Sequence, residues 1–196
     1  MSLDAKKVYI GTPDQSATTG AVLSGDVITT IPADIDAAIT AITGFTSSGY
    51  VSADGVTLST ELSTNDLQEW KGSVVRKLME SFTGTISLNL IQADYEGWCQ
   101  AVGAENVTRI AATMTHGEQL HISLGAHMAA PKAWALKMKD GDSRMLVLVP
   151  NGQVVSNIEI TFASSEAIAL PLEISCNDDG TGESIHIYTD DGIVSA

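Results

Sequence analysis

Three histidines lie within a stretch of twelve residues, and imidazole nitrogens are common ligands of zinc. His116, His121 and His127 are separated by five and six positions. On a strand the first two side chains would face opposite sides of the sheet, and the spacing matches none of the usual zinc motifs. The pattern therefore predicts solvated or core histidines and no metal site, with an enzyme built on this cluster as the alternative.

Paired carboxylates form a second group of possible ligands. Asp178-Asp179 and Asp190-Asp191 each lie directly before a glycine, which is typical of turns; calcium binding is the alternative, because hard cations prefer oxygen ligands in such loops. The sequence contains no G-x-S-x-G motif, no phosphate-binding loop, no dinucleotide fingerprint and no pair of acids placed as general acid and base. We therefore expect no catalytic residue, no cofactor and no enzymatic activity.

The charge of the chain argues against several classes of partner. Its 196 residues include 24 Asp and Glu against 10 Lys and Arg, a formal charge of −14, and each half carries 12 acids and 5 bases. Such an excess of acid opposes a basic grip on nucleic acid and adhesion to anionic membranes. No apolar run has the length of a membrane span or a signal peptide, so we expect neither. Cys99 and Cys176 are expected to be half-buried free thiols.

Alternation of apolar and polar residues, which is typical of strands with one buried face, dominates the chain. It is clearest over residues 82–90 and 168–176, and it recurs over 56–62 and 154–162. Pro171 lacks an N–H and therefore predicts a strand edge or a bulge.

Two turn motifs divide residues 132–162. Asp140-Gly141-Asp142 and Pro150-Asn151-Gly152 lie between alternating runs, and Asp-Gly and Asn-Gly pairs are frequent in tight hairpins. We therefore expect three successive antiparallel strands here, and further short strands near 120–124 and 185–187.

One segment has helical periodicity. Apolar residues recur at helical spacing between Ile91 and Val102, with Asp94 placed to cap the start and Gly103 to end the helix. We expect a helix over about 92–102 and, on a weaker pattern, a second one over 32–42. Residues 11–30 and 63–80 are expected to be irregular, and no linker divides the chain.

A segment in the first half of the chain carries a family resemblance. Gly49-Tyr50-Val51-Ser52-Ala53-Asp54-Gly55-Val56-Thr57 is followed by Asp66, Trp70, Gly72 and Val74-Val75-Arg76, then by the strand from Phe82 and the helix from Asp94. Together with the preceding Pro32-Ala33-Asp34, this order and spacing over roughly residues 30–105 resembles the major tail protein of long-tailed, non-contractile bacteriophages. Lys71 departs from the pattern, in which a small residue is expected.

The resemblance implies a mainly β fold. Residues 1–196 are expected to form one antiparallel β-sandwich or half-barrel domain of the phage tail-tube type, with one short flanking α-helix and no C-terminal immunoglobulin-like domain. Such subunits form hexameric rings that stack into a tube, the conduit for genome delivery. Ring closure pairs the open sheet edges, and repetition along the axis makes a filament.

The resemblance also implies where subunits meet. Residues 49–80 are expected to form a long loop or arm that docks onto the neighbouring ring, and residues 1–30 an N-terminal arm that becomes ordered on assembly. The candidate interface residues are Tyr50, Asp54, Asp66, Trp70 and Arg76. Trp70 is expected to anchor the contact and Arg76 to pair with an acid across it; a core role for Trp70 and a surface ion pair for Arg76 are the alternatives.

The implied partners are further copies of the chain and other tail proteins, namely the tape measure, the tail tip and the tail terminator. The expected location is the virion tail, and the host cytoplasm during assembly. DNA is expected to pass through the lumen without specific binding, which the acidity of the chain favours, and no membrane partner is expected. The alternatives are a tube protein of a contractile injection or secretion system, and a β-sandwich module that binds carbohydrate or decorates the virion.

Overall fold

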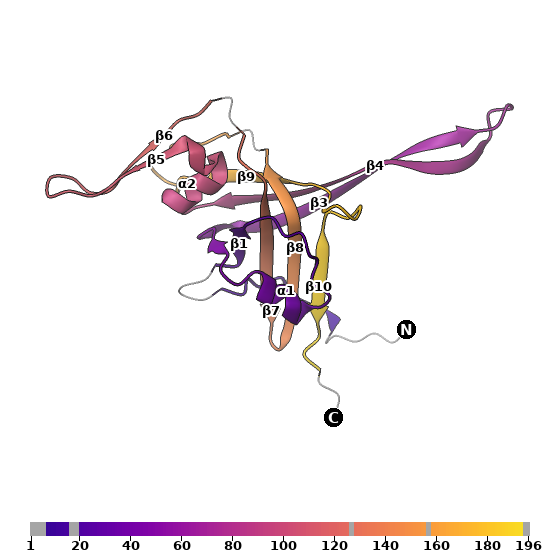
Figure 1. The fold of residues 1–196 in the computed structure, drawn as a ribbon, viewed down its shortest axis with the longest axis horizontal. Coiled ribbons are helices and arrows are strands. Elements are labelled where there is room, and N and C mark those ends of the chain that lie inside the picture. The colour runs from indigo at the N-terminus through magenta and orange to yellow at the C-terminus, as the bar shows by residue number, and fades with distance from the viewer. Residues whose placement is uncertain (1–6, 16–19, 126–127, 156–157, 194–196) are drawn as a thin grey trace.

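A computed structural model of the chain describes residues 7–15, 20–125, 128–155 and 158–193, and Figure 1 shows how their elements are arranged. The strands are β1 (Val22–Gly25), β2 (Thr46–Ser47), β3 (Val51–Gln68), β4 (Val74–Leu90), β5 (Val107–Ile110), β6 (Gln119–Ile122), β7 (Lys132–Asp140), β8 (Ser143–Val154), β9 (Leu170–Cys176) and β10 (His186–Asp190). The helices within these residues are α1 (Ile35–Ala41) and α2 (Tyr95–Val102), followed by a 3₁₀ turn, η2 (Ala104–Asn106).

Two layers of strands belong to one sheet, because β8 takes part in both. The strand order is β2-β1-β7-β8-β9-β4-β3, with β10 paired to β8 off this path and β5 paired with β6 separately. β8 pairs with β10 over residues 144–148 but with β9 only over 152–154. The strands β7, β8 and β10 therefore run across β3, β4 and β9 (Figure 1). This antiparallel, mainly β arrangement confirms the predicted sandwich-like fold class.

The main core lies between the two layers. β4 and β9 contribute alternate apolar residues, all buried: Ile86, Leu88, Leu90, Leu170, Leu172 and Ile174. The crossing strands contribute Trp134, which is 1% exposed, and Val149. One buried face on each strand is what the alternating pattern over 82–90 and 168–176 predicts, and both predictions are confirmed.

Both helices begin at an aspartate. The Oδ1 atoms of Asp34 and Asp94 accept hydrogen bonds from the backbone N–H three residues further on, at 2.8 and 2.9 Å, which stabilises the first helical turn. Gly103 ends α2 with a φ of 89°, a conformation that favours glycine. The helices predicted near 92–102 and 32–42 are therefore both present, and the expectation of one flanking helix is corrected to two. In the described part of the chain, no helix has the length and apolarity needed to span a membrane.

β8 continues through Pro150-Asn151-Gly152, where the sequence predicts a turn. A Cβ atom on Gly152 would lie 2.8 Å from Cδ1 of Trp134 and 2.8 Å from Cγ2 of Ile174. The glycine is therefore required for space beside the indole, and this packing overrides the local turn propensity. The turn predicted at Asp140-Gly141-Asp142 is confirmed, because β7 and β8 meet there.

Three further predictions of local structure are wrong. Residues 158–162 form no strand, so the third of the three successive strands is absent; residues 156–157 lie outside the described residues. Ile158 and Ile160 still pack against the core, and this packing of alternate residues explains the pattern without a paired strand. β1 lies within 11–30 and pairs with the distant strand β7. β3 and β4 occupy most of 63–80 as a hairpin, whose two exposed faces leave no alternating pattern in the sequence.

Candidate subunit interface

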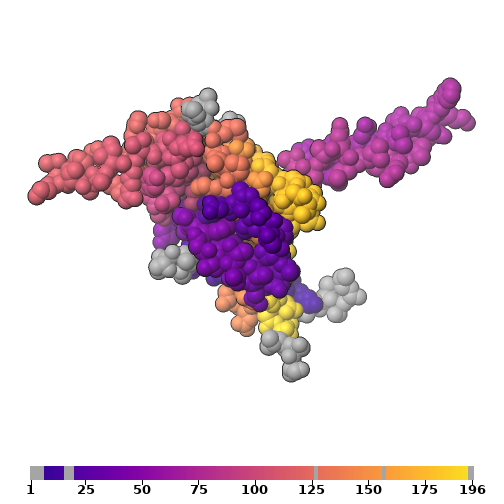
Figure 2. All heavy atoms as spheres, viewed as in Figure 1, coloured from indigo at the N-terminus to yellow at the C-terminus, as the bar shows by residue number. Residues whose placement is uncertain are grey.

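The β3–β4 hairpin is longer than the sheet to which it belongs. β9 pairs with β4 only from Gly84 to Leu90, whereas the pairing of β3 with β4 continues to Gln68 and Val74. Residues 62–82, here called the arm, therefore extend away from the body, as Figures 1 and 2 show. A two-stranded ribbon has no second layer of its own, and nearly all side chains of the arm are exposed.

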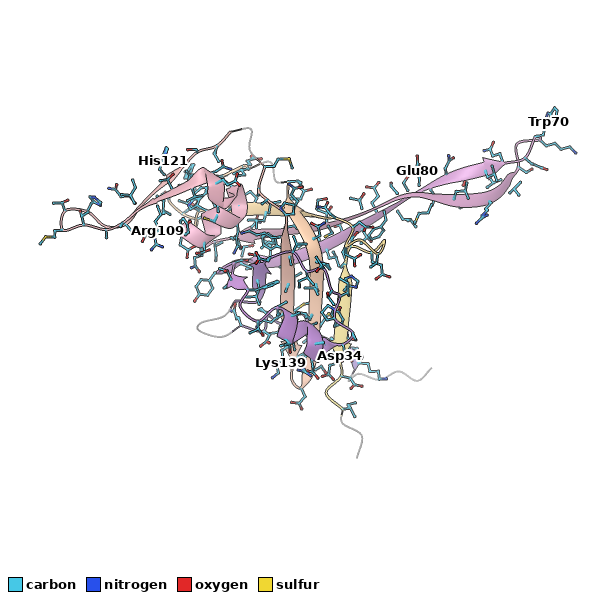
Figure 3. All side chains as sticks on the ribbon, viewed as in Figure 1. Asp34, Trp70, Glu80, Arg109, His121 and Lys139 are labelled. Carbon is cyan, nitrogen blue, oxygen red and sulfur yellow. The ribbon has the colours of Figure 1, made fainter. Side chains whose placement is uncertain are left out.

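Trp70 lies at the tip of the arm and points into solvent (Figure 3). The tip is closed by hydrogen bonds from the N–H of Glu69 to the carbonyl of Ser73, at 2.9 Å, and from the N–H of Gly72 to the carbonyl of Glu69, at 2.8 Å. Gly72 has a φ of 86°, which a residue with a Cβ rarely adopts. Trp70 is 104% exposed, so the structure excludes a core role for it.

The arm carries three of the ten basic residues of the chain, Lys71, Arg76 and Lys77. The Nζ atom of Lys77 donates a hydrogen bond to Oδ1 of Asp66 on the facing strand, at 2.8 Å. Arg76 lies opposite Leu67 and forms no ion pair within the described residues. The surface ion pair of the arm therefore belongs to Lys77, and the guanidinium of Arg76 is available to an acid of another molecule.

The other two predicted interface residues lie at the opposite end of the same hairpin. Tyr50 directly precedes β3 and is 65% exposed. Asp54 lies near the start of β3 and borders a shallow polar hollow of about 280 Å³. The structure therefore brings Asp66, Trp70 and Arg76 onto one arm and places Tyr50 and Asp54 at the other end of the hairpin.

Sequence reasoning missed the apolar residues of the arm. Apart from Trp70, these residues are between 39% and 72% exposed: Leu62, Leu67, Val74, Val75, Leu78, Met79 and Phe82. The sequence does contain an indication of this exposed apolar surface, because the adjacent residues Leu78 and Met79 lie on opposite faces of a strand. Apolar residues on both faces are typical of strands that are covered on both sides.

The sheet formed by β3, β4 and β9 turns a polar face away from the core. Residues that are paired across neighbouring strands share a face, and this face consists of the rows Thr57, Ser87 and Glu173; Ser59, Thr85 and Ser175; and Glu61 and Thr83. We call these residues the outer face. It is rich in hydroxyl groups, both of its charged residues are acidic, and none of its residues is Lys or Arg.

Possible metal ligands and thiols are dispersed. His116 and His121 lie in the β5–β6 hairpin, and His127 lies outside the described residues. No group of three His, Cys, Asp or Glu residues within the described part of the chain could hold a metal ion. Cys99 and Cys176, expected to be half buried, are buried, and burial raises the pKa of Cys176 to about 11, which favours the protonated thiol at neutral pH.

Asp178-Asp179 lies in the loop after β9, whereas Asp190 is the last residue of β10 and Asp191 follows it, so the second pair is not wholly in a turn as predicted. Oδ1 of Asp179 accepts hydrogen bonds from the N–H and the hydroxyl of Thr181, both at 2.7 Å, and Oδ2 lies 2.9 Å from Nε2 of His186. The hydrogen bonds from Thr181, followed by the interaction with His186, lower the pKa of Asp179 to about 2. A hydrogen bond from Arg144 at 2.5 Å likewise lowers the pKa of Asp190.

Comparison with known proteins bears directly on this geometry. A family model described as phage tail tube protein matches residues 13–195, which is most of the chain. The matched range includes the arm, the outer face and every named strand. No curated protein matches the sequence.

Proposed function

Since the chain belongs to the phage tail tube protein family, we propose that its copies form hexameric rings that stack into the tube of a bacteriophage tail. The chain is a structural tail tube subunit of the virion tail, which assembles with copies of itself and with other tail proteins. The proposal goes further in four respects: the hexameric ring, the absence of catalysis, assembly in the host cytoplasm, and contacts with the tape measure, the tail tip and the tail terminator.

The single observation that carries the proposal is the arm. Residues 62–82 extend beyond the body, and the indole of Trp70 at their tip is wholly in solvent. Exposed apolar surface of this kind marks a contact between proteins, and Trp is enriched among the residues that dominate binding energy. The arm therefore docks onto the neighbouring ring with Trp70 as its anchor. Tyr50 and Asp54, at the other end of the hairpin, contact a neighbouring copy.

The distribution of charge supports docking between copies. The arm contains three bases and three acids, a sum of 0, whereas the whole chain has −14; the rest of the chain therefore carries all of the excess of acid. A neutral arm is not repelled by the acidic body of another copy, while two bodies repel each other. Arg76, which lacks an acid within the described part of its own chain, meets a carboxylate of the neighbouring copy.

The outer face suits the wall of the lumen. Its hydroxyl groups hold water, and its two charged residues, Glu61 and Glu173, repel phosphate. Proteins grip DNA by neutralising phosphates with Lys and Arg, and the outer face has neither. DNA therefore passes along this wall without specific binding.

A variant without the arm tests the proposal. Leu62 and Phe82 are directly paired, so residues 63–81 can be replaced by an Asn-Gly turn that closes the hairpin. The variant should remain a folded monomer, because the arm lies outside the core, and electron microscopy of the concentrated protein should show no tubes where the unaltered protein forms them. A folded variant that still forms tubes of normal width would contradict the proposal.

A further inference from the structure

We propose that each arm is held between two other copies of the chain, one on each face of the hairpin. This inference rests on the proposed docking of the arm, and it adds how many copies the arm contacts and which residues meet each of them. The arm then lies at the seam between two adjacent subunits of the next ring. It joins those two subunits to each other as well as to its own ring.

One face of the arm continues the side of β3 that faces the core. Leu58 packs against the core, and alternate residues of a strand share a face, so Leu62 and Thr64 lie on the same side. Their partners on β4 are Phe82 and Met79. This core-side face exposes Leu62, Met79 and Phe82, which are 59%, 72% and 47% exposed.

The opposite face of the arm continues the polar outer face of the sheet. Asn65 and Leu67 lie on it, with Leu78 and Arg76 as their partners on β4. Leu67 is 52% exposed and Leu78 39%. This face therefore exposes two leucines and an arginine that has no ion pair in the described part of the chain.

The outer face changes character where the sheet leaves the body. Near the body its rows consist of Ser, Thr and Glu, whereas on the arm the same side presents Leu67 and Leu78. A surface that stays in water gains nothing from leucines, while a buried contact gains free energy from each one. The outer face is therefore wet near the body and covered on the arm.

A single flat surface cannot cover both faces of the arm. Side chains of successive residues stand on opposite sides of a strand, so Leu78 and Met79 point to different surfaces. The outer side of the arm also carries Arg76, a cation with no ion pair in the described part of the chain, and the body of another copy carries the excess of acid that attracts it. Two copies of this chain supply the two surfaces.

Paired substitutions separate the two faces. Leu62→Ser with Met79→Ser alters the core-side face, and Leu67→Ser with Leu78→Ser alters the outer one. Thr64→Ser with Asn65→Ser, one polar change on each face, is the matched control. Each apolar pair should raise the critical concentration for tube formation, measured by sedimentation, by about tenfold or more. The control should leave it unchanged, and all three variants should keep the thermal midpoint of the monomer.

The outcomes distinguish this inference from the docking on which it rests. If only one of the two apolar pairs weakens assembly, the inference is overturned and docking through one face stands. If neither apolar pair weakens assembly, both this inference and the proposed docking of the arm are overturned. A photo-reactive amino acid placed at position 78 or at position 79 of otherwise unaltered protein gives a second measurement in assembled tubes. Cross-links from the two positions should map to different segments of partner chains, and a single shared segment would overturn the inference.

Discussion

The Nζ atom of Lys77 lies 2.8 Å from Oδ1 of Asp66 across the two strands of the arm, whereas its neighbour Arg76 has no acid partner in the described part of the chain. Adjacent residues of a strand face opposite ways, so the two cations serve different sides of the arm. An exposed ion pair such as Lys77–Asp66 adds little to stability. The cation left for a neighbouring molecule is therefore Arg76.

Arg76→Gln should weaken tube assembly more than Lys77→Gln does. Loss of Arg76 removes a charge-assisted contact with the next copy, while loss of Lys77 removes a pair that is already satisfied within the arm. Neither change should shift the thermal midpoint of the monomer, because both side chains are exposed. The critical concentrations for tube assembly of the two variants, compared at low and high salt, test this difference in assembly. Equal effects of the two variants would refute the distinction between Arg76 and Lys77.

Trp70→Ala should raise the critical concentration of assembly by ~30-fold, which corresponds to about 2 kcal/mol, the usual cost of removing a dominant interface side chain. The free energy of unfolding of the monomer should not change, because the indole contacts no core. Met114→Ala is the control, since Met114 is equally exposed, at 103%, but lies on the other hairpin. Equal effects of the two variants would mean that the tip of the arm is no anchor.

Gly152→Ala should destabilise the monomer by about 1–3 kcal/mol, the usual cost of overpacking a core. The new Cβ would lie 2.8 Å from atoms of both Trp134 and Ile174. Gly117→Ala is the control, because a Cβ at Gly117 meets nothing within 4 Å. Chemical denaturation measures the free energy of unfolding of both variants. If Gly152→Ala were as stable as the unaltered protein, the glycine would not be needed for space beside the indole.

The charge of Asp179 should stabilise the fold at neutral pH. The folded state lowers the pKa of Asp179 from 3.8 to about 2, so its contribution is complete above the unfolded value and is lost as the pH falls from about 4 to about 2. Asp179→Asn keeps an oxygen for Thr181 but removes this titration. The free energy of unfolding should therefore fall less steeply over that range in the variant, and an identical pH dependence would contradict the assignment.

A lysine on the outer face should slow genome ejection. Glu61→Lys places a cation on the proposed wall of the lumen, where it would bind passing phosphates. Glu105→Lys makes the same change of charge in the exposed turn η2 and should leave the rate unchanged. Ejection kinetics of phage carrying each variant give the comparison. Equal rates for both would mean that the outer face does not line the path of the DNA.

The parts of the fold that the sequence predicts well are those in which local pattern and final packing agree. Alternation over 82–90 and 168–176 corresponds to β4 and β9 because one face of each strand is buried by the crossing layer. α2 is predicted because its periodicity, its capping Asp94 and its terminating Gly103 all indicate the same helix.

The failures occur where the local sequence pattern does not reveal the contacts that decide the structure. Pro150-Asn151-Gly152 has turn propensity, but the indole of Trp134 occupies the space beside the glycine and the strand continues. Residues 63–80 look irregular because the arm exposes both of its faces and so has no single apolar side to reveal a strand. Three of the five predicted interface residues lie on that arm. The motif that contains Trp70 and Arg76 indicates this segment as an interface, whereas the periodicity of the sequence does not.

A cryo-electron microscopy reconstruction of assembled tubes tests the central claim most directly. We predict six-fold rings in which residues 62–82 of each subunit cross to the next ring, with Trp70 buried there and the outer face of β3, β4 and β9 turned to the lumen. Tubes in which the arm projects freely into solvent, or in which the outer face lies on the outside, would contradict the account.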